Sequence, residues 1–260
     1  MLRLGEESVF GVIINLGSQR ISVLKILFFI PSFNDQKGIS AIVSALLNKF
    51  HDARVLVVDD GSTPAIDLDL TSNHEAQRAC LIRLVSNEGL GLATSIAIDY
   101  MMQGNFDCLV RLDADGQHPI CEIDALKEKI CSNLADVVWG ERVNDISLKT
   151  PKAVMGSVTK KFIAWLGRLI FKSHVTDWYT GFFAINRAAA IATQGTYLER
   201  YCEVQLLCIF HAAKLRVGTH PIEQLERNHG QSSINWFGGM MIMMRSSLIM
   251  LLYALRMHPK

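Results

Sequence analysis

Short apolar runs alternate with segments of helical periodicity over the first half of the chain. The apolar runs, each of a length suited to one buried strand, cover residues 25–33, 53–62, 80–86, 106–116 and 135–142. Between them, apolar side chains recur at helical spacing in residues 38–50, 91–104 and 119–130. Continuous apolar strands that alternate with helices are typical of a mostly parallel sheet with helices on both faces. The pattern therefore predicts an α/β fold.

The chain shows no internal repeat and no low-complexity linker, and its 260 residues suit one large α/β domain. We predict an N-terminal extension at residues 1–24, the domain at residues 25–233 and a C-terminal helix at residues 234–260. The extension has a short apolar patch preceded by two glutamates. It resembles neither a signal peptide nor a membrane span.

The C-terminal segment is apolar almost all round, but Arg245, Ser246 and Ser247 interrupt it near its middle. Arginine at the centre of a bilayer costs roughly 2.5–3.5 kcal/mol on insertion scales. Three arrangements are open: a helix in the membrane interface, a helix packed on the domain or on a partner protein, and a marginal span. The interruption favours the first, which predicts a cytoplasmic protein held peripherally at the membrane surface.

Composition narrows the choice of partners and compartment. The chain has 26 basic and 25 acidic residues, so its net charge of +1 gives no electrostatic reason to expect a nucleic acid partner. Its six cysteines are scattered without a C-x-x-C pair. This pattern indicates reduced thiols rather than disulfides or a metal site.

Polar residues gather where the predicted strands end, at residues 31–35, 59–62, 86–91 and 113–118. In an open α/β sheet, ligands bind beyond the carboxyl ends of the strands. Four polar strand ends at one edge therefore predict a binding site there. Taken alone, Asp59 and Asp60 are equally well explained as parts of a turn.

Asp113 and Asp115 stand one residue apart, and their charges repel unless a cation or a shared proton lies between them. A calcium loop would need Gly at its sixth position and Glu at its twelfth, but Gly116 is fourth and Asp124 twelfth. The sequence DADG also resembles the nucleophile motif of haloacid-dehalogenase-like phosphatases, which usually lies near the N-terminus. The third interpretation is Mg²⁺ or Mn²⁺ on a nucleotide diphosphate, held by Asp113, Asp115 and the amide oxygen of Gln117.

Six segments, in this order, resemble family-2 glycosyltransferases: IPSFND, VVDDGS, NEGLG, LDADGQHP, TDWYTGFFAINR and RNHGQSSI. The resemblance covers residues 25–234 and is closest to polyprenyl- or dolichyl-phosphate sugar synthases and bacterial cell-surface polysaccharide transferases. It implies the GT-A fold and inverting transfer from a nucleotide-diphosphate sugar with Mn²⁺ or Mg²⁺. It also implies a polyprenyl-phosphate or membrane-bound glycan acceptor in cell-envelope polysaccharide or glycolipid synthesis. A membrane partner protein is a further possibility.

The resemblance also implies roles for individual residues. The residues that would bind the donor nucleotide are Pro31, Asp59, Asp60, Asn87, Asp113 and Arg227. Arg227 precedes a segment that resembles the loop closing over the diphosphate. Asp113, Asp115 and Gln117 would hold the metal. Asp177 and Glu203 would be the catalytic carboxylates, with Asp177 taking the proton of a hydroxyl acceptor.

A lipid phosphate acceptor is already ionised and would depend on cations instead. The cations that lie between the fifth predicted strand and Asp177 are Arg142, Lys149, Lys152, Lys160 and Lys161.

The chain departs from the family pattern at three places. Leu90 stands between Gly89 and Gly91 where a basic residue is frequent, Thr180 stands where Ser is frequent, and Phe183 stands where Arg is common. The change at Phe183 puts one phosphate or acceptor contact in question. Two other functions therefore stay open, a nucleotide-sugar-binding scaffold subunit of a membrane complex and a phosphatase.

Overall fold

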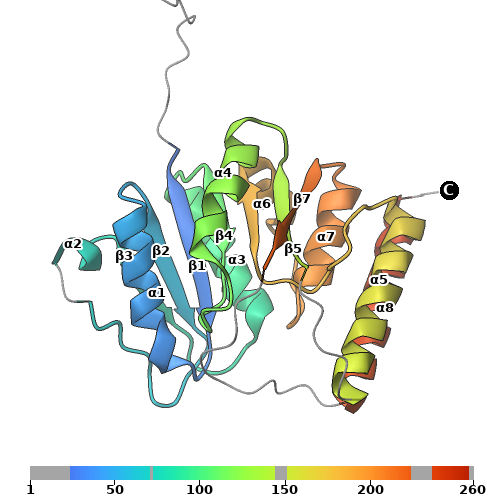
Figure 1. Ribbon diagram of the computed structural model, residues 1–260, viewed down its shortest axis with the longest axis horizontal. Helices are drawn as coiled ribbons and strands as arrows, with labels where there is room; N and C mark the ends of the chain where they lie inside the picture. The colour runs from blue at the N-terminus through green and yellow to red at the C-terminus, as the bar shows by residue number, and fades with distance from the viewer. Residues whose placement is uncertain (1–23, 71–72, 144–150, 224–235, 258–260) are drawn as a thin grey trace, which may run out of the picture.

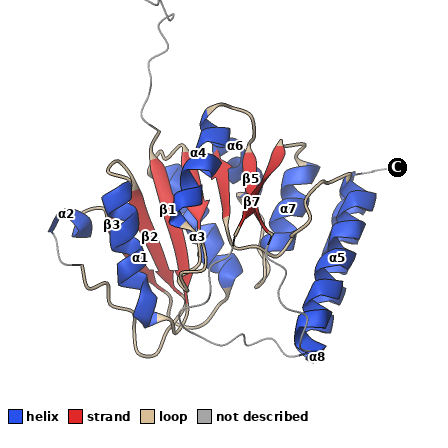
Figure 2. Cartoon of the chain, in the orientation of Figure 1, coloured by secondary structure: helices blue, strands red, loops and turns tan. Residues whose placement is uncertain are grey.

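The computed structural model describes residues 24–70, 73–143, 151–223 and 236–257, and Figures 1 and 2 show a central sheet between layers of helices. The sheet order is β3-β2-β1-β4-β6-β5-β7. The strands are β1 (Ile26–Ser32), β2 (Arg54–Asp59), β3 (Ala79–Arg83), β4 (Cys108–Arg111), β5 (Val137–Arg142), β6 (Phe183–Asn186) and β7 (Val217–Ile222). All neighbours are parallel except β6, which runs antiparallel to both β4 and β5. The predicted mostly parallel sheet is confirmed.

The strands are apolar on both faces because helices cover both faces. Along β1, Phe28 and Ile30 belong to one core cluster, and Leu27 and Phe29 belong to the other. This alternation follows from the two-residue period of a strand. The first cluster also holds apolar side chains of α1 (Gln36–Lys49) and α4 (Ile123–Cys131). The second holds those of α3 (Leu90–Gln103), α6 (Arg187–Thr193) and α7 (Glu203–Ala212).

Two long helices, α5 (Pro151–Phe171) and α8 (Trp236–Met257), lie side by side at one end of the molecule (Figure 1). Met250 of α8 is completely buried in the core cluster of α7. Tyr179 donates a hydrogen bond from its hydroxyl to Ser246 Oγ at 3.0 Å, and Arg245 forms an ion pair with Glu199. Two of the three residues that interrupt the apolar segment, Arg245 and Ser246, therefore attach α8 to the domain.

The opposite face of α8 is open to solvent. By length and composition Gly238–Arg256 is apolar enough to cross a bilayer, with a mean hydropathy of 1.5, and only 11% of that stretch is buried. One such helix is weak support for a span, since other apolar helices meet the same criteria. The structure thus combines the packed arrangement with an exposed apolar face, and contact of that face with a membrane stays a prediction.

The remaining helical pieces are short. They are α2 (Asn73–Ala76) and the 3₁₀ turn η1 (Ile120–Glu122) that leads into α4. Residues 1–23, Lys149, Arg227 and residues 229–233 lie outside the described residues, so the roles predicted for them stay predictions.

Candidate active site

The loops after β1 and β2 are bound to each other at the carboxyl edge of the sheet. Asn34 donates its backbone N–H to Ser62 Oγ at 2.8 Å, and its side-chain oxygen accepts from the backbone N–H of Thr63 at 2.9 Å. The fully buried Asp59 accepts from the backbone N–H groups of Ser62 at 2.9 Å and Ile66 at 3.3 Å. Asp59 therefore stabilises the turn that follows it, in agreement with the interpretation of this residue as part of a turn.

Asp60 binds the loop after β3. Its two carboxylate oxygens accept from the backbone N–H groups of Glu88 and Gly89, each at 2.8 Å. Gly89 has a φ of +97°, which favours glycine. Asp60 thus holds the polypeptide that leads into α3.

The same loop is held from its other side by the segment before α7. A Cβ at Gly91 would lie only 2.3 Å from the carbonyl oxygen of Glu199, so no larger residue fits. Arg200 donates to the side chain of Asn87. Half-buried Pro31 lies in β1 opposite Val58. Pro31, Asp59, Asp60 and Asn87 therefore lie in or beside the loops that form the rim of the site at the carboxyl edge of the sheet. Nucleotide binding by these residues stays a prediction.

Residues 113–118 form a tight turn just after β4. Asp113 donates its backbone N–H to His118 Nδ1 at 2.9 Å, and Gln117 donates its backbone N–H to Asp115 Oδ1 at 3.1 Å. Gly116 has a φ of +74°. Because Nδ1 accepts, the proton of neutral His118 resides on Nε2, which lies 3.8 Å from Asp113 Oδ2. Burial lowers the pKa of His118 although both aspartates oppose this, so His118 acts here as a structural hydrogen-bonding group.

The oxygen ligands of this turn fit a hard divalent cation. The Asp113 side chain is 38% exposed, although its neighbours His118 and Arg111 are buried. Burial opposes ionisation of Asp113, but Arg111, with smaller contributions from His118 and Arg142, lowers the pKa overall, so the carboxylate is charged at neutral pH. In the described part of the chain, no three His, Cys, Asp or Glu side chains form a self-contained metal site. A cation here would complete its shell with ligand oxygens, as Mg²⁺ does with phosphates.

Arg111 is a site residue that the sequence analysis missed. It is the last residue of β4 and is buried, with 2% exposure. Its Nη1 donates to Glu203 Oε1 and its Nη2 to Asp113 Oδ1, both at 3.1 Å. Burial alone would lower the pKa of Arg111, but the two carboxylates raise it, so the side chain is permanently charged. The available signal was a lone charge inside an otherwise apolar strand.

Glu203, predicted as catalytic, lies in the first turn of α7 with its side chain 12% exposed. Its carboxylate makes the ion pair with Arg111 rather than a cap on its own helix. The catalytic role stays a prediction, for a carboxylate that binds Arg111 through Oε1.

Asp177 has no exposed surface and lies between two cations. Arg142 Nη2 donates to Asp177 Oδ1 at 2.8 Å, and Lys160 Nζ lies 3.1 Å from Oδ2. The backbone N–H of Tyr179 also donates to Oδ1 at 3.2 Å. Burial would raise the pKa of Asp177, but Arg142 and Lys160 lower it. A carboxylate of low pKa is a weak base, which disfavours Asp177 as a proton acceptor at neutral pH.

The aromatic side chains near the site belong to the core. Trp178 is completely buried and donates its Nε1–H to the carbonyl of Val175. Phe183, at the position where Arg is frequent in the family pattern, stacks on Trp139 at 4.7 Å between ring centroids. The guanidinium of Arg111 lies 5.6 Å from the centre of the Phe183 ring. Arg111 thus places a positive charge next to Phe183, at the position where the family pattern commonly has Arg.

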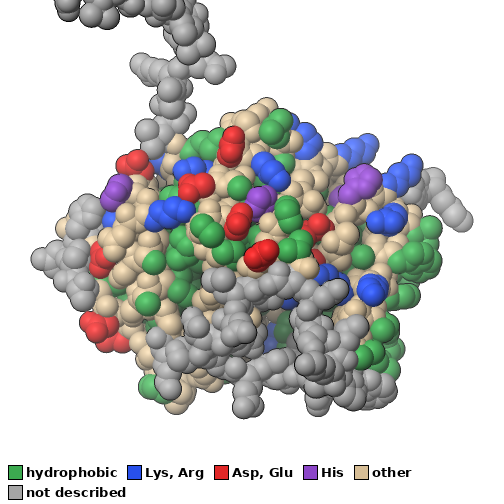
Figure 3. Space-filling view, in the orientation of Figure 1, with side chains coloured by type: hydrophobic (Ala, Val, Ile, Leu, Met, Phe, Trp, Pro, Cys, Tyr) green, Lys and Arg blue, Asp and Glu red, His purple; other side chains and the backbone are tan. Residues whose placement is uncertain are grey.

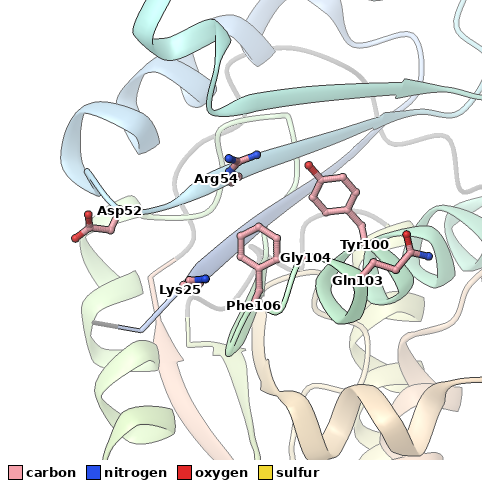
Figure 4. Close-up of a pocket in the computed structure, with 7 residues that line it drawn as sticks. All are labelled: Lys25, Asp52, Arg54, Tyr100, Gln103, Gly104 and Phe106. Atoms are coloured by element: carbon pink, nitrogen blue, oxygen red, sulfur yellow. The ribbon is translucent and has the colours of Figure 1, made fainter. Parts of the chain in front are cut away.

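A separate pocket of about 530 Å³ lies at the opposite, amino end of the strands (Figure 4). Its lining residues are Lys25, Asp52, Arg54, Tyr100, Gln103, Gly104 and Phe106. None of these is a predicted site residue. The strand ends that carry the acidic turn, rather than this pocket, form the candidate active site.

Several known proteins resemble this chain in sequence or in fold. The model of the family described as "Glycosyl transferase family 2" matches residues 28–193. An undecaprenyl-phosphate mannosyltransferase of Micrococcus luteus is 26% identical over 82% of this chain and 88% of its own. A UDP-N-acetylglucosamine–dolichyl-phosphate N-acetylglucosaminyltransferase of Methanococcus voltae is 27% identical over 77% of this chain and 85% of its own.

Solved structures give the same fold. Glucosyl-3-phosphoglycerate synthase of Mycobacterium tuberculosis, crystallised with Mn²⁺ and UDP-glucose, matches with a TM-score of 0.64 and 17% identity. The match covers 92% of this chain and 81% of the synthase. The predicted GT-A fold is confirmed.

Replacing Gly181 with alanine tests how closely the site is built around Asp113. The new Cβ would lie 2.5 Å from Asp113 Oδ2 and 2.8 Å from Arg111 Nη2, so one of them must move. We expect Gly181→Ala to lower Mn²⁺-dependent binding of UDP or GDP at least about tenfold, measured by calorimetry, because displaced ligands typically cost 10–100-fold. Gly156→Ala is the control, since nothing lies within 4 Å of its Cβ. Equal binding by both variants would contradict the prediction.

Replacing Asp177 with asparagine tests its ion pairs. Its folded-state pKa is lowered, so its stabilising contribution is complete above the ordinary carboxyl value of 3.8 and is lost as the pH falls below that value. We expect Asp177→Asn to cost about 1.5–3 kcal/mol in urea unfolding at pH 7. The difference from wild type should shrink below pH 3.8. Asp99→Asn, at an exposed position of α3, should change nothing. A pH-independent difference would show that the charge of Asp177 is not what stabilises the fold.

Proposed function

Because the chain belongs to glycosyl transferase family 2, we propose that it transfers a sugar, with inversion, from a nucleotide-diphosphate donor to a polyprenyl phosphate. The product is a lipid-linked sugar of the kind used in cell-envelope polysaccharide or glycolipid synthesis. Because the matching family consists of glycosyl transferases, we interpret the acidic turn as a donor-binding element and not as the nucleophile motif of a phosphatase. The names of the relatives support the acceptor, since one is an undecaprenyl-phosphate and the other a dolichyl-phosphate transferase.

The observation that carries this proposal is the state of the two predicted catalytic carboxylates. Asp177 is paired with Arg142 and Lys160, and Glu203 is paired with Arg111. A hydroxyl acceptor needs a base of suitable pKa to take its proton. A lipid phosphate is already ionised and needs none. The pairing of Asp177, whose pKa Arg142 and Lys160 lower, therefore favours a phosphate acceptor over a glycan hydroxyl.

Arg142 and Lys160 provide what a phosphate acceptor does need. Their side chains are 26% and 31% exposed, whereas Asp177 between them is fully buried. In this arrangement Asp177 orients two cations whose remaining N–H groups are available to an incoming anion. We therefore assign Asp177 to the acceptor site as the residue that positions Arg142 and Lys160.

On the donor side, Asp113 and Asp115 would hold Mn²⁺ or Mg²⁺, with the amide of Gln117 as a further ligand. Such an ion would neutralise the charge that develops on the leaving nucleotide diphosphate. The acceptor phosphate oxygen attacks the anomeric carbon from the face opposite the diphosphate, which inverts that centre. The residues of the chain hold the two reactants in line, and this positioning supplies much of the rate.

The acceptor lipid implies contact with a membrane, and α5 and α8 offer the surface. Figure 3 shows hydrophobic side chains gathered along the side of the molecule where these helices lie. The exposed apolar side chains of this two-helix face are Val154, Val158, Phe162, Trp165, Leu169, Met241, Met244, Leu248, Leu251, Leu252 and Leu255. Each side chain taken out of water contributes roughly 1.5–3 kcal/mol when fully buried.

Charge favours an anionic bilayer over a second copy of the chain as the partner of this face. The two helices contain Lys152, Lys160, Lys161, Arg168, Arg245 and Arg256 and no acidic residue, although the whole chain is nearly neutral. Lys160 and Arg245 are paired with Asp177 and Glu199, but the other four cations leave the two helices positively charged. Two copies brought together by this face would repel, whereas anionic headgroups attract it. We propose a peripheral position at the cytoplasmic face of the membrane, where the Arg142–Lys160 site receives the lipid phosphate.

The activity itself is tested by turnover of nucleotide sugars. We expect the full-length protein with Mn²⁺ to transfer sugar from UDP- or GDP-linked donors to polyprenyl phosphate but not to unphosphorylated polyprenol. Asp115→Asn should reduce the rate about 10²–10³-fold while the protein stays folded, because one oxygen ligand of the cation is lost. Binding without turnover by the wild-type protein would favour the scaffold function, and equal use of polyprenol would reject the phosphate site.

Membrane contact is tested by liposome sedimentation. The full chain should co-sediment with vesicles containing phosphatidylglycerol, and the double variant Trp165→Ser/Leu169→Ser should bind several-fold less, because two exposed apolar anchors are lost. Leu134→Ser is the control, since Leu134 is 70% exposed but lies in the turn before β5. Wild-type protein that stays in the supernatant would instead assign the face to another protein subunit.

A further inference from the structure

Arg111 connects two carboxylates that come from distant parts of the chain. Asp113 follows β4 by two residues, and Glu203 lies in the first turn of α7. The guanidinium donates to both at 3.1 Å while its own side chain is 3% exposed. It is the buried centre of a carboxylate–arginine–carboxylate chain whose Asp113 end is partly exposed.

We propose that Arg111 is the positioning residue of the metal–diphosphate site and that Glu203 is its anchor. The inference rests on the proposed function, because it concerns the cation that the donor would bring. Arg111 occupies Oδ1 of Asp113, so the orientation of that carboxylate is set before any ligand arrives. Its other oxygen, Oδ2, lies 3.8 Å from His118 Nε2, beyond a normal hydrogen bond. Asp113 thus presents one oxygen that Arg111 does not use.

The surroundings of Arg111 keep it in this position. Its guanidinium lies over the Phe183 ring, and Glu203 belongs to a helix whose next seven residues, up to Phe210, are all buried. Gly181 leaves no room for a Cβ between the Asp113 carboxylate and Arg111. A long side chain that would otherwise lose rotamer freedom on ligand binding is therefore already ordered.

Stability alone does not account for this chain of charges. Buried ion pairs contribute little net stability, and apolar side chains of similar size often replace them without loss. Arginine suits the position because its planar fork reaches two carboxylates at once, which a lysine does not. Residues that orient metal ligands commonly change metal affinity 10–100-fold when they are removed. Arg111 would raise the metal affinity in this way, by orienting Asp113.

The test separates metal affinity from folding and from activity. Arg111→Met alone would leave Glu203 buried without a partner, so the informative variant is Arg111→Met/Glu203→Gln, which removes both charges of that pair. The readout is the Mn²⁺ concentration that half-saturates the thermal shift produced by excess UDP or GDP, compared with the shift produced by the nucleotide without metal. Arg216→Met/Asp136→Asn, which removes both charges of a remote ion pair, is the matched control.

We expect the double variant to need about 10–100-fold more Mn²⁺ with unchanged metal-free nucleotide binding. Arg111→Lys should lie between it and wild type, and the control should match wild type. A folded double variant with wild-type Mn²⁺ dependence overturns the role of Arg111 while leaving the proposed function intact. Wild-type protein without any Mn²⁺ response to UDP or GDP overturns the metal site itself, and the proposal falls with it.

Discussion

Each carboxylate that is buried at the carboxyl edge of the sheet needs a hydrogen-bond donor or a cation as its partner. The partners that these carboxylates bind determine the arrangement of the site. Asp59 and Asp60 take backbone N–H groups, and so they fix the loops after β2 and β3. Asp177 takes two cations, and Glu203 takes one. Leaving any of them unpaired would cost more than the pairing contributes in net stability. The rim of the site is therefore rigid before a substrate binds.

This compensation divides the edge into two regions of opposite electrostatic character. Around Asp113 and Asp115 the acidic groups exceed the cations, since Arg111 is shared with Glu203. Around Asp177 the cations exceed the carboxylate, because Arg142 and Lys160 share one partner. The proposed reaction brings together two anions, a nucleotide diphosphate and a lipid phosphate. The acidic region suits the nucleotide diphosphate, which would bind together with a divalent cation. The basic region suits the lipid phosphate, which would bind without one.

The sequence predicted the parts of the fold whose signal is local. Continuous apolar runs identified β1, β2, β3, β4 and β5, and all of these except β3 are buried on both faces. β6 and β7 lie outside the predicted runs; β7 is a half-buried edge strand, and the four residues of β6 are not part of a longer apolar run. The acidic turn was evident from Asp113 and Asp115. The pairing of Asp177 with Arg142 joins residues 35 positions apart, and that of Arg111 with Glu203 joins residues 92 apart. Such contacts depend on topology, which periodicity does not reveal.

The antiparallel strand β6 is what brings the two regions together. Because β6 runs against β4, its first residue, Phe183, pairs with Arg111, the last residue of β4. The residues just before β6 therefore lie beside the acidic turn that follows β4, which is why Gly181 contacts Asp113. Because β6 also runs against β5, Phe183 pairs with Trp139, and the end of β5 carries Arg142 to Asp177. From the same segment Tyr179 reaches Ser246 of α8. A parallel strand at this position would have sent residues 177–182 to the amino edge, and the metal turn, the cation pair and the apolar helix would not meet.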